Sequence, residues 1–271
     1  MMKKTTLFVL ITLYTCINLM AQVIARPLKE VAILTMPGDN GSNGASVVWH
    51  PALKRYVASF AGNAAYPLAI FDVMGNRISP DGLETMLDLR GMWYNTVTKR
   101  IEANGYNDKG WISYQLDVKG IPEDFKSILS GQVQPDAQSV GVFDAAKKRV
   151  CFLNGSKIFS YSLQGAIADD IIELKFKNNV STQPEGELED NSKPVAEYNI
   201  TTLCYTGMVN AEFGVLNYGE IQIECYNRKG ILTKIFKLPE DISLYTNFNF
   251  AYANGIWWMF DKDNRKWVGF K

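Results

Sequence analysis

The sequence predicts an all-β protein built from repeated units of short strands. Apolar and aromatic runs recur along the chain, separated by turns rich in Gly, Asn, Asp and Pro. Aromatic residues make up 12% of the sequence, which favours strands. The runs also fall into self-similar units about 45–60 residues apart, a period typical of radial β repeats.

The amino end has the pattern of a secretory signal peptide. Lys3 and Lys4 precede an apolar run, Leu7–Met20, that is shorter than a membrane span, and Ala21 follows. This ending resembles signal peptides of Bacteroidota, so we expect a signal peptide over 1–21 and export to the periplasm, cell surface or medium. A rival cut before Cys16, which would give a lipoprotein, is the weaker alternative because the residues before it fit a lipobox poorly.

Size and charge narrow the class of the mature protein. About 250 residues suit one large β domain, expected over 28–271, and no second apolar run is long enough to span a membrane. The sequence carries 28 basic and 28 acidic residues. Because a nucleic-acid binder is expected to show a basic excess, we expect no nucleic-acid partner.

Three cysteines remain after cleavage of the signal peptide, and their number is odd. Cys151, Cys204 and Cys225 each lie in a largely apolar run. We therefore favour buried free thiols over a Cys204–Cys225 disulfide, although export permits disulfides.

Three stretches share one pattern at the start of their units. An apolar run ends in an aromatic residue or His, a turn follows, and a Lys-Arg pair precedes the next strand. The stretches are Ser46–Val57, Arg90–Ile101 and Ser139–Cys151. When the three stretches are aligned on the aromatic residue or His that ends each apolar run, His50 is equivalent to Tyr94 and Phe143. Because the Lys-Arg pairs lie at turn exits, we interpret them as solvated hairpin ends in preference to a basic binding patch.

A second pattern closes the later part of each unit. A strand-like run ends in a glycine, which can supply the positive φ of a tight turn, and a further strand follows. The runs are Leu68–Gly75, Ile112–Gly120, Ile158–Gly165 and Ile221–Gly230. Each unit therefore reads as four strands.

The spacing of the units predicts a closed ring of five. Units start near Ser46, Arg90, Ser139, Asn199 and Asn247, and the longest spacing holds a polar, acidic stretch, 177–195, that reads as a flexible insert. The last unit has three strands, Phe248–Tyr252, Ile256–Phe260 and Lys266–Phe270. The lone strand Glu30–Thr35 supplies its fourth, which closes the ring and removes exposed sheet edges.

These repeats resemble β-propellers of the NHL or TolB-like kind over residues 28–271, with no match to a particular family. The resemblance implies a five-bladed β-propeller closed by an amino-terminal strand. A β-sandwich with a second small β domain is the alternative fold.

Residues that could carry chemistry have structural explanations. His50 is the only histidine, and the repeat places a ring there, so we expect no catalytic residue and no conventional zinc site. The glycine loop Pro37–Gly44 opens onto a strand instead of a helix, so it is interpreted as a mobile loop and not as a phosphate site. The run Asp261–Asn264 approaches a calcium pattern but fits a hairpin turn better. We therefore expect no cofactor.

Acidic residues argue against a glycosidase. Glycoside hydrolysis needs two carboxyl groups about 5–10 Å apart around a sugar pocket. Asp144 ends one predicted inner strand, whereas Asp72, Asp117 and Glu224 fall on third strands, away from the axis. The other inner strands present Trp49, Trp93, Thr202 and Asn249. An enzyme is disfavoured, and a glycoside-directed enzyme stays as an alternative.

Binding is the function that these exclusions leave. We expect an exported binding module of the cell envelope that recognises a protein or glycan, with a structural subunit of an envelope complex as a further alternative. The expected ligand face is formed by loops between blades and by middle hairpins, without any individual ligand-binding residue assigned. These loops are Gly38–Gly44, Pro80–Asp88, Ser130–Asp136, the insert, Pro239–Tyr245, Gly62–Asn63, Asn107–Asp108 and Asn154–Gly155, with Tyr66, Tyr106 and Tyr218 in similar positions.

Overall fold

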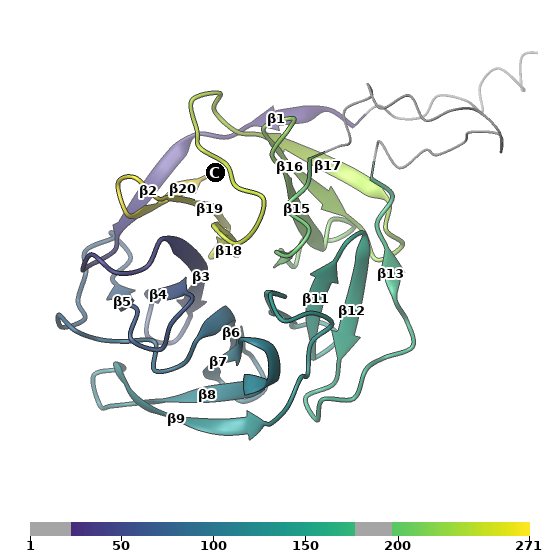
Figure 1. Cartoon of the computed structure of the whole chain (residues 1–271). Helices are drawn as coiled ribbons and strands as arrows, with labels where there is room; N and C mark the ends of the chain where they lie inside the picture. Colours follow the sequence, from purple (N-terminus) through teal and green to yellow (C-terminus); the bar gives the residue numbers. More distant parts are fainter. Residues whose placement is uncertain (1–22, 177–196) are drawn as a thin grey trace, which may run out of the picture.

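The chain folds into a five-bladed β-propeller, as the sequence predicts. The computed structural model describes residues 23–176 and 197–271. Five sheets surround a central axis (Figure 1), which excludes the sandwich alternative. The signal peptide expected over 1–21, the alternative cut at Cys16 and the insert expected over 177–195 lie outside the described residues and stay predictions.

Each blade is one antiparallel sheet whose strands are ordered from the axis outwards. Blade 1 contains β3 (Asn43–His50), β4 (Arg55–Ala61) and β5 (Leu68–Phe71). Blade 2 contains β6 (Leu89–Asn95), β7 (Arg100–Gly105), β8 (Trp111–Leu116) and β9 (Pro122–Leu129), with the short 3-10 helix η1 (Asn107–Lys109). Blade 3 contains β10 (Val142–Asp144), β11 (Arg149–Asn154), β12 (Lys157–Tyr161) and β13 (Ile172–Glu173).

The last two blades also recruit strands from the amino end. Blade 4 contains β14 (Cys204–Tyr205), β15 (Phe213–Asn217), β16 (Gln222–Tyr226) and β17 (Leu232–Lys237). Blade 5 contains β18 (Phe250–Ala253), β19 (Ile256–Asp261), β20 (Lys266–Phe270) and β2 (Glu30–Thr35). A strand that precedes residue 28, β1 (Ala25–Pro27), runs parallel to β17 and adds a fifth strand to blade 4.

The predicted closure of the ring is confirmed. Strand β2 pairs antiparallel with β20, so that Leu34 lies opposite Trp267 and both side chains are fully buried. The first strand of this blade is shorter than expected. Strand β18 begins at Phe250 because Phe248 and Asn249 both have positive φ and leave the extended conformation.

One hairpin turn recurs five times and sets the register of the blades. Its first residue accepts hydrogen bonds from backbone N–H groups inside the turn, and the residue before the next strand has a φ of +50 to +58°. The paired ends are His50–Arg55, Asn95–Arg100, Asp144–Arg149, Asn217–Gln222 and Asp261–Lys266. The Lys-Arg pairs are therefore hairpin ends, as predicted, and Asp261–Asn264 belongs to a turn.

This register corrects the alignment of His50. His50 is equivalent to Asn95 and Asp144, and not to Tyr94 and Phe143, because all three pair with the arginine that ends the turn. The sequence alignment matched the last ring of each strand and was therefore wrong by one residue, since Trp49 and not His50 is the equivalent of Tyr94.

A second turn joins the third and outer strands. Asp72, Asp117, Ser162 and Asn227 each accept two backbone N–H groups, and a glycine with a φ of +70 to +84° lies three residues later. At Gly230 a Cβ would lie 1.9 Å from the carbonyl oxygen of Glu173 in blade 3. Glycine is thus required both by the backbone and by the neighbouring blade.

The hydrophobic core is divided among the interfaces between neighbouring blades. Trp93 packs with Trp111, Phe143 and Phe152 between blades 2 and 3, and corresponding clusters fill the other four interfaces. Both sides of each sheet are buried in this way, which explains why the strands read as apolar runs without strict alternation.

The three cysteines are free and buried. Cys204 and Cys225 both pair with Gly214, from opposite sides, so their Cα atoms are about 9–10 Å apart, too far for a disulfide. Burial raises the pKa of Cys151 and of Cys225 to about 12, so neither is a thiolate near neutral pH. Within the described residues no helix is long and apolar enough to cross a membrane.

Candidate functional site: the central channel and its two ends

The inner strands of all five blades line a central channel with a volume of about 210 Å³. Its described lining contains no Asp, Glu, His, Lys or Arg side chain. The volume is smaller than the roughly 300–1,000 Å³ of pockets that hold drug-sized ligands. It therefore suits a small group, such as one sugar ring or one protein side chain.

Five equivalent aromatic residues, one from each blade, line this channel. They are Trp49, Tyr94, Phe143, Tyr205 and Tyr252, which we call the channel-mouth aromatics. Phe143 is buried and the other four are partly exposed. Each lies near the end of its inner strand, close to the turn that leads to the second strand.

Neighbouring rings fix the orientation of these side chains. The ring centroids of Trp49 and Tyr56 are 4.7 Å apart, and those of Tyr252 and Trp257 are 4.4 Å apart. Burial raises the pKa of the Tyr252 hydroxyl, which therefore stays protonated and able to donate a hydrogen bond. The lining itself offers aromatic surface and neutral polar groups, whereas the hydroxyl of Tyr205 is hydrogen-bonded to the Asp144 carboxylate just outside the lining.

The opposite end of the channel is closed by contacts across the axis. The Arg90 guanidinium of blade 2 lies 4.5 Å from the ring centroid of Tyr106 and 5.7 Å from that of Phe248, which leads into blade 5. Blades 2 and 5 are not neighbours, so this contact crosses the channel. Asn199 donates to the carbonyl oxygen of Phe248 at 2.9 Å and stabilises its positive φ, an unusual conformation for a bulky residue.

The two faces of the propeller can now be distinguished. The turn face carries the turns that join the inner to the second strands and the third to the outer strands. The inter-blade face carries the loops between blades and the hairpins that join the second to the third strands. Because Arg90 and Phe248 close the inter-blade end, the channel opens on the turn face.

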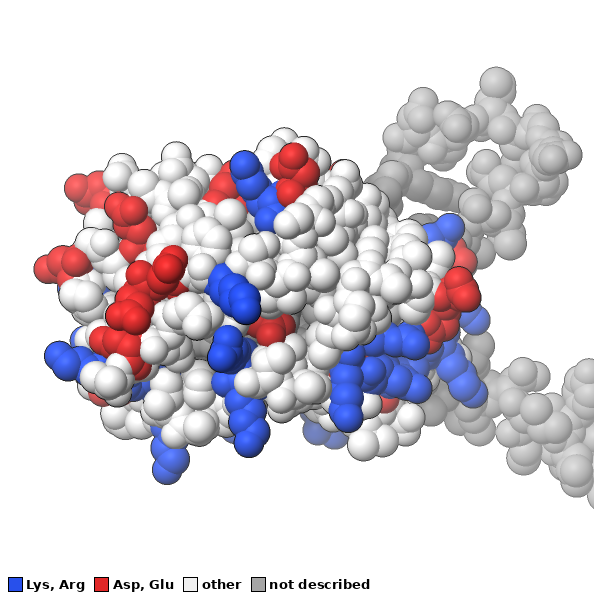
Figure 2. Space-filling view, turned by 90° about the horizontal axis from the view of Figure 1, so that it is seen from below, with Lys and Arg blue, Asp and Glu red and all other residues white. Residues whose placement is uncertain are grey.

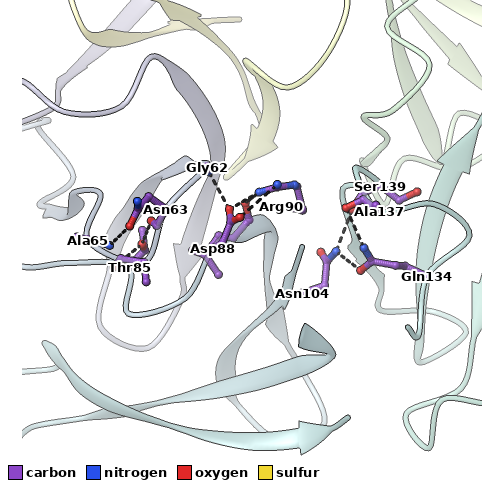
Figure 3. A network of polar contacts seen from close by, with 12 residues as sticks. Gly62, Asn63, Ala65, Thr85, Asp88, Arg90, Asn104, Gln134, Ala137 and Ser139 are labelled. Atoms are coloured by element: carbon purple, nitrogen blue, oxygen red, sulfur yellow. Dashed lines mark hydrogen bonds and ion pairs between the residues drawn. The ribbon is translucent and has the colours of Figure 1, made fainter. Parts of the chain in front are cut away.

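Apart from the insert, which lies outside the described residues, the loops expected to bind ligand lie on the inter-blade face, where hydrogen bonds tie several of them to neighbouring segments (Figure 3). Asn104 donates to Gln134 at 2.6 Å, and Gln134 donates to the carbonyl oxygen of Ala137 at 3.2 Å. Asp88 accepts from the backbone of Gly62 at 3.0 Å and from Arg90. Much of the polar surface of these loops is therefore engaged within the protein.

The glycine loop before β3, expected from the sequence to be mobile, is hydrogen-bonded to blade 5. Arg265 donates to the carbonyl oxygens of Gly41 at 2.5 Å, Asn40 at 2.9 Å and Pro37 at 3.2 Å. Its guanidinium also lies 4.7 Å from the ring centroid of Phe60. No sequence pattern indicated this contact, since Arg265 is more than 220 residues from the loop.

His50 lies outside the channel lining. It is buried, with 7% of its surface exposed, and its Nδ1 accepts from the backbone of Leu53 at 3.3 Å. Burial lowers its pKa, so the ring is neutral near pH 7. Its position corresponds to a turn cap and not to a general base beside the channel.

Asp144, the acid nearest the axis in the sequence analysis, is paired with a cation. Arg228 of blade 4 donates to its two carboxylate oxygens at 2.5 and 2.9 Å. Although burial raises the pKa of this carboxyl, the hydrogen bonds from Arg228 and from the backbone of Lys147 lower it more. Asp144 thus joins blades 3 and 4 at the turn face.

The other acids considered lie away from the channel lining. Asp72 and Asp117 cap turns that follow the third strands of their blades, whereas Glu224 lies within the third strand β16. Glu224 is fully buried and accepts from Tyr198, Tyr226, Asn217 and Gln222. Over the described ranges, no group of three or more His, Cys, Asp or Glu side chains could hold a metal ion.

Comparison with known proteins identifies no family for this chain. No family model matches the chain, and no curated protein does. Among solved structures it is similar to a streptogramin B lyase, with a TM-score of 0.42 and 16% identity over 86% of this chain and 65% of that chain. It is also similar to a chain of a nidogen/laminin complex, with a TM-score of 0.42 and 11% identity over 81% of this chain and 73% of that chain. A gluconolactonase from Xanthomonas campestris is similar with a TM-score of 0.42 and 10% identity over 89% of this chain and 87% of that chain. At these identities the likeness concerns the fold alone.

Proposed function

We propose that this chain is an exported binding module of the cell envelope, and that it takes one neutral sugar ring of a glycan into the turn-face mouth of its channel. The proposal rests on the channel-mouth aromatics, which surround a space of single-ring size without an ionised side chain. Aromatic faces suit the apolar face of a sugar ring, and the tyrosine hydroxyls suit its hydroxyl groups. Export is the expectation from the sequence of residues 1–21.

Binding of neutral glycans, measured by isothermal titration calorimetry so that the readout does not depend on Trp49, tests this proposal. We expect Trp49→Ala to weaken binding about fivefold, since one aromatic contact is worth about 1 kcal/mol. Tyr252→Phe, which keeps the ring and removes the hydroxyl, should weaken it less. Both variants should keep the far-ultraviolet circular dichroism of the parent.

A control variant on the inter-blade face distinguishes a site at the channel mouth from one on the inter-blade loops. Tyr218→Ala changes a partly exposed tyrosine of the inter-blade face and should leave glycan affinity unchanged. Loss of binding in Tyr218→Ala, with Trp49→Ala unaffected, would place the ligand on the inter-blade loops. Binding of a protein and of no glycan would support the wider function but reject the sugar.

The enzymatic alternative has a separate readout. Turnover of a glycan that Asp144→Asn abolishes would show a glycoside-directed enzyme and reject the binding-only function. The third alternative, a structural subunit of an envelope complex, predicts stable copurification with other envelope proteins from the native cell.

A further inference from the structure

The turns of neighbouring blades meet on the turn face and form one continuous surface. Arg55 of blade 1 donates to the carbonyl oxygen of Lys119 in blade 2. The side chain of Leu53 lies where a Cβ at Gly120 would clash, at 2.6 Å. Together with the pairing of Arg228 and Asp144, these contacts bring turns from separate blades side by side.

This surface is basic although the sequence as a whole carries no net charge. Blades 1, 2 and 3 each contribute the Lys-Arg pair of their hairpin turn, at residues 54–55, 99–100 and 148–149. Lys119, Lys147, Arg228 and Lys229 lie in the same set of turns. Repetition of this turn between the first and second strands of three neighbouring blades has therefore gathered positive charge on one face.

Several acidic residues on the same face are engaged in the fold, among them Asp170, which pairs with Arg149, whereas Glu123, Asp124 and Asp169 are exposed there. Asp72 and Asp117 accept backbone N–H groups of their turns, and Asp144 is paired with Arg228. The inter-blade face is more acidic, with Asp39, Asp81, Glu84, Asp108, Asp136 and Asp241 in its loops, although Lys109, Lys157, Lys262 and Arg265 lie there too. Figure 2 shows this separation from the side, with Lys and Arg towards the lower edge and Asp and Glu mostly above them.

Apolar side chains protrude from the tips of these basic turns. Val118 is fully exposed, Val209 is 82% exposed and Met74 is 79% exposed. Val97 and Leu53 are also exposed at turn tips. Single exposed apolar residues are common, and Ile24, Val31, Tyr106 and Ile200 are exposed elsewhere, but these five all lie in turns of one face.

We propose that the turn face docks on a lipid bilayer that carries anionic phosphate headgroups. Basic residues near such a surface are attracted to it, and protruding apolar side chains can enter the boundary between headgroups and acyl chains. An acidic protein would suit the charges but would leave Val118, Val209 and Met74 without an apolar environment. This inference goes beyond the proposed function. Because the channel mouth opens on the same face, a docked bilayer would cover it, so vesicle binding and glycan binding should exclude each other.

Cosedimentation of the mature protein with vesicles tests the docking. We expect binding to vesicles rich in anionic phospholipid, little binding to vesicles of zwitterionic lipid alone, and weaker binding as salt is raised. Each basic residue near the surface contributes about fivefold in affinity. The triple variant Lys119→Glu, Lys147→Glu, Lys229→Glu should therefore bind about a hundredfold more weakly or worse.

The matched control makes the same change of charge elsewhere. Lys109→Glu, Lys126→Glu, Lys157→Glu alters three exposed lysines outside the turn face and should retain most of the affinity. Val118→Ser with Val209→Ser should lose about tenfold, whereas Ile128→Ser with Ile171→Ser, on the outer part of blades 2 and 3, should lose little.

Three outcomes would overturn the inference. These are equal binding to zwitterionic vesicles, equal loss in the two triple variants, or binding to a soluble acidic polymer without binding to anionic vesicles. Because glycan binding depends on Trp49 and vesicle binding on the turn tips, either property can fail while the other is retained.

Discussion

At the scale of single residues, we expect replacement of the buried Glu224 to cost a large part of the stability of the fold. Its carboxylate has no exposed surface and accepts hydrogen bonds from four side chains. Glu224→Ala would leave these four donors in an apolar interior without their acceptor. We expect it to lower the free energy of unfolding by about 3–5 kcal/mol, measured by urea denaturation.

Glu220→Ala is the control for this prediction, because Glu220 lies in the exposed hairpin before β16. It should change the free energy of unfolding by less than about 0.5 kcal/mol. Similar losses in the two variants would mean that the hydrogen bonds to Glu224 contribute little.

The pair Asp144–Arg228 gives a dependence of stability on pH. The pKa of Asp144 in the folded protein lies below its ordinary value of 3.8, so the pair stabilises the fold above that pH. Its contribution falls as the pH drops through the lower, folded-state pKa. Asp144→Asn should therefore cost about 1–2 kcal/mol at pH 7, a modest value because Arg228 is partly exposed, and less at pH 3 or below.

Urea denaturation of the parent and of Asp144→Asn at both pH values checks this expectation. A difference between the two proteins that is as large in acid as at pH 7 would show that the carboxylate charge is not the cause.

At the scale of elements, the turn glycines separate backbone strain from contact between blades. Gly230 and Gly155 both have positive φ, +70° and +61°, but only at Gly230 would a Cβ meet a neighbouring backbone. Gly155→Ala should cost about 1 kcal/mol, the strain of a left-handed backbone alone. Gly230→Ala should cost about 3 kcal/mol or more, because blades 3 and 4 must also move apart.

Thermal and urea unfolding of the two variants provide the measurement. Equal costs would indicate that the blades yield at this contact and that the positive φ alone requires glycine.

At the scale of the whole molecule, the ring depends on β2. A chain that starts at Pro37 lacks this strand, exposes the edge of β20 and loses the packing of Leu34. We expect it to associate into oligomers or aggregates through the open edge, as seen by light scattering, and to unfold at lower urea concentration.

A chain that starts at Leu28 is the matched control, since it lacks β1 and keeps β2. It should have the same oligomeric state as the parent protein and should lose less stability than the chain that starts at Pro37. An unchanged monomer in the chain from Pro37 would contradict the importance of closure.

Local patterns in the sequence were sufficient for the architecture. Strand-forming runs, glycines that end them and Lys-Arg pairs at turn exits predicted four-stranded units, which is wrong only for blade 1, a sheet of three strands. Their count with the strand Glu30–Thr35 predicted a closed ring of five blades, which is confirmed. These signals act within a few residues, so they can be read without the tertiary structure. The same patterns misplaced His50 by one residue, because the register of a strand depends on its pairing with the next strand and not on which residue is the last aromatic one.

Only the tertiary structure decided which residues meet. It placed the channel-mouth aromatics around one axis, closed the other end with Arg90 and Phe248, and brought the basic turns together on one face. The Lys-Arg pairs are hairpin ends, as their sequence context predicts, and the ring makes them neighbours. Charge and curvature of a surface arise from side chains far apart in sequence, so the sequence alone determined the repeat and the folded ring determined the site.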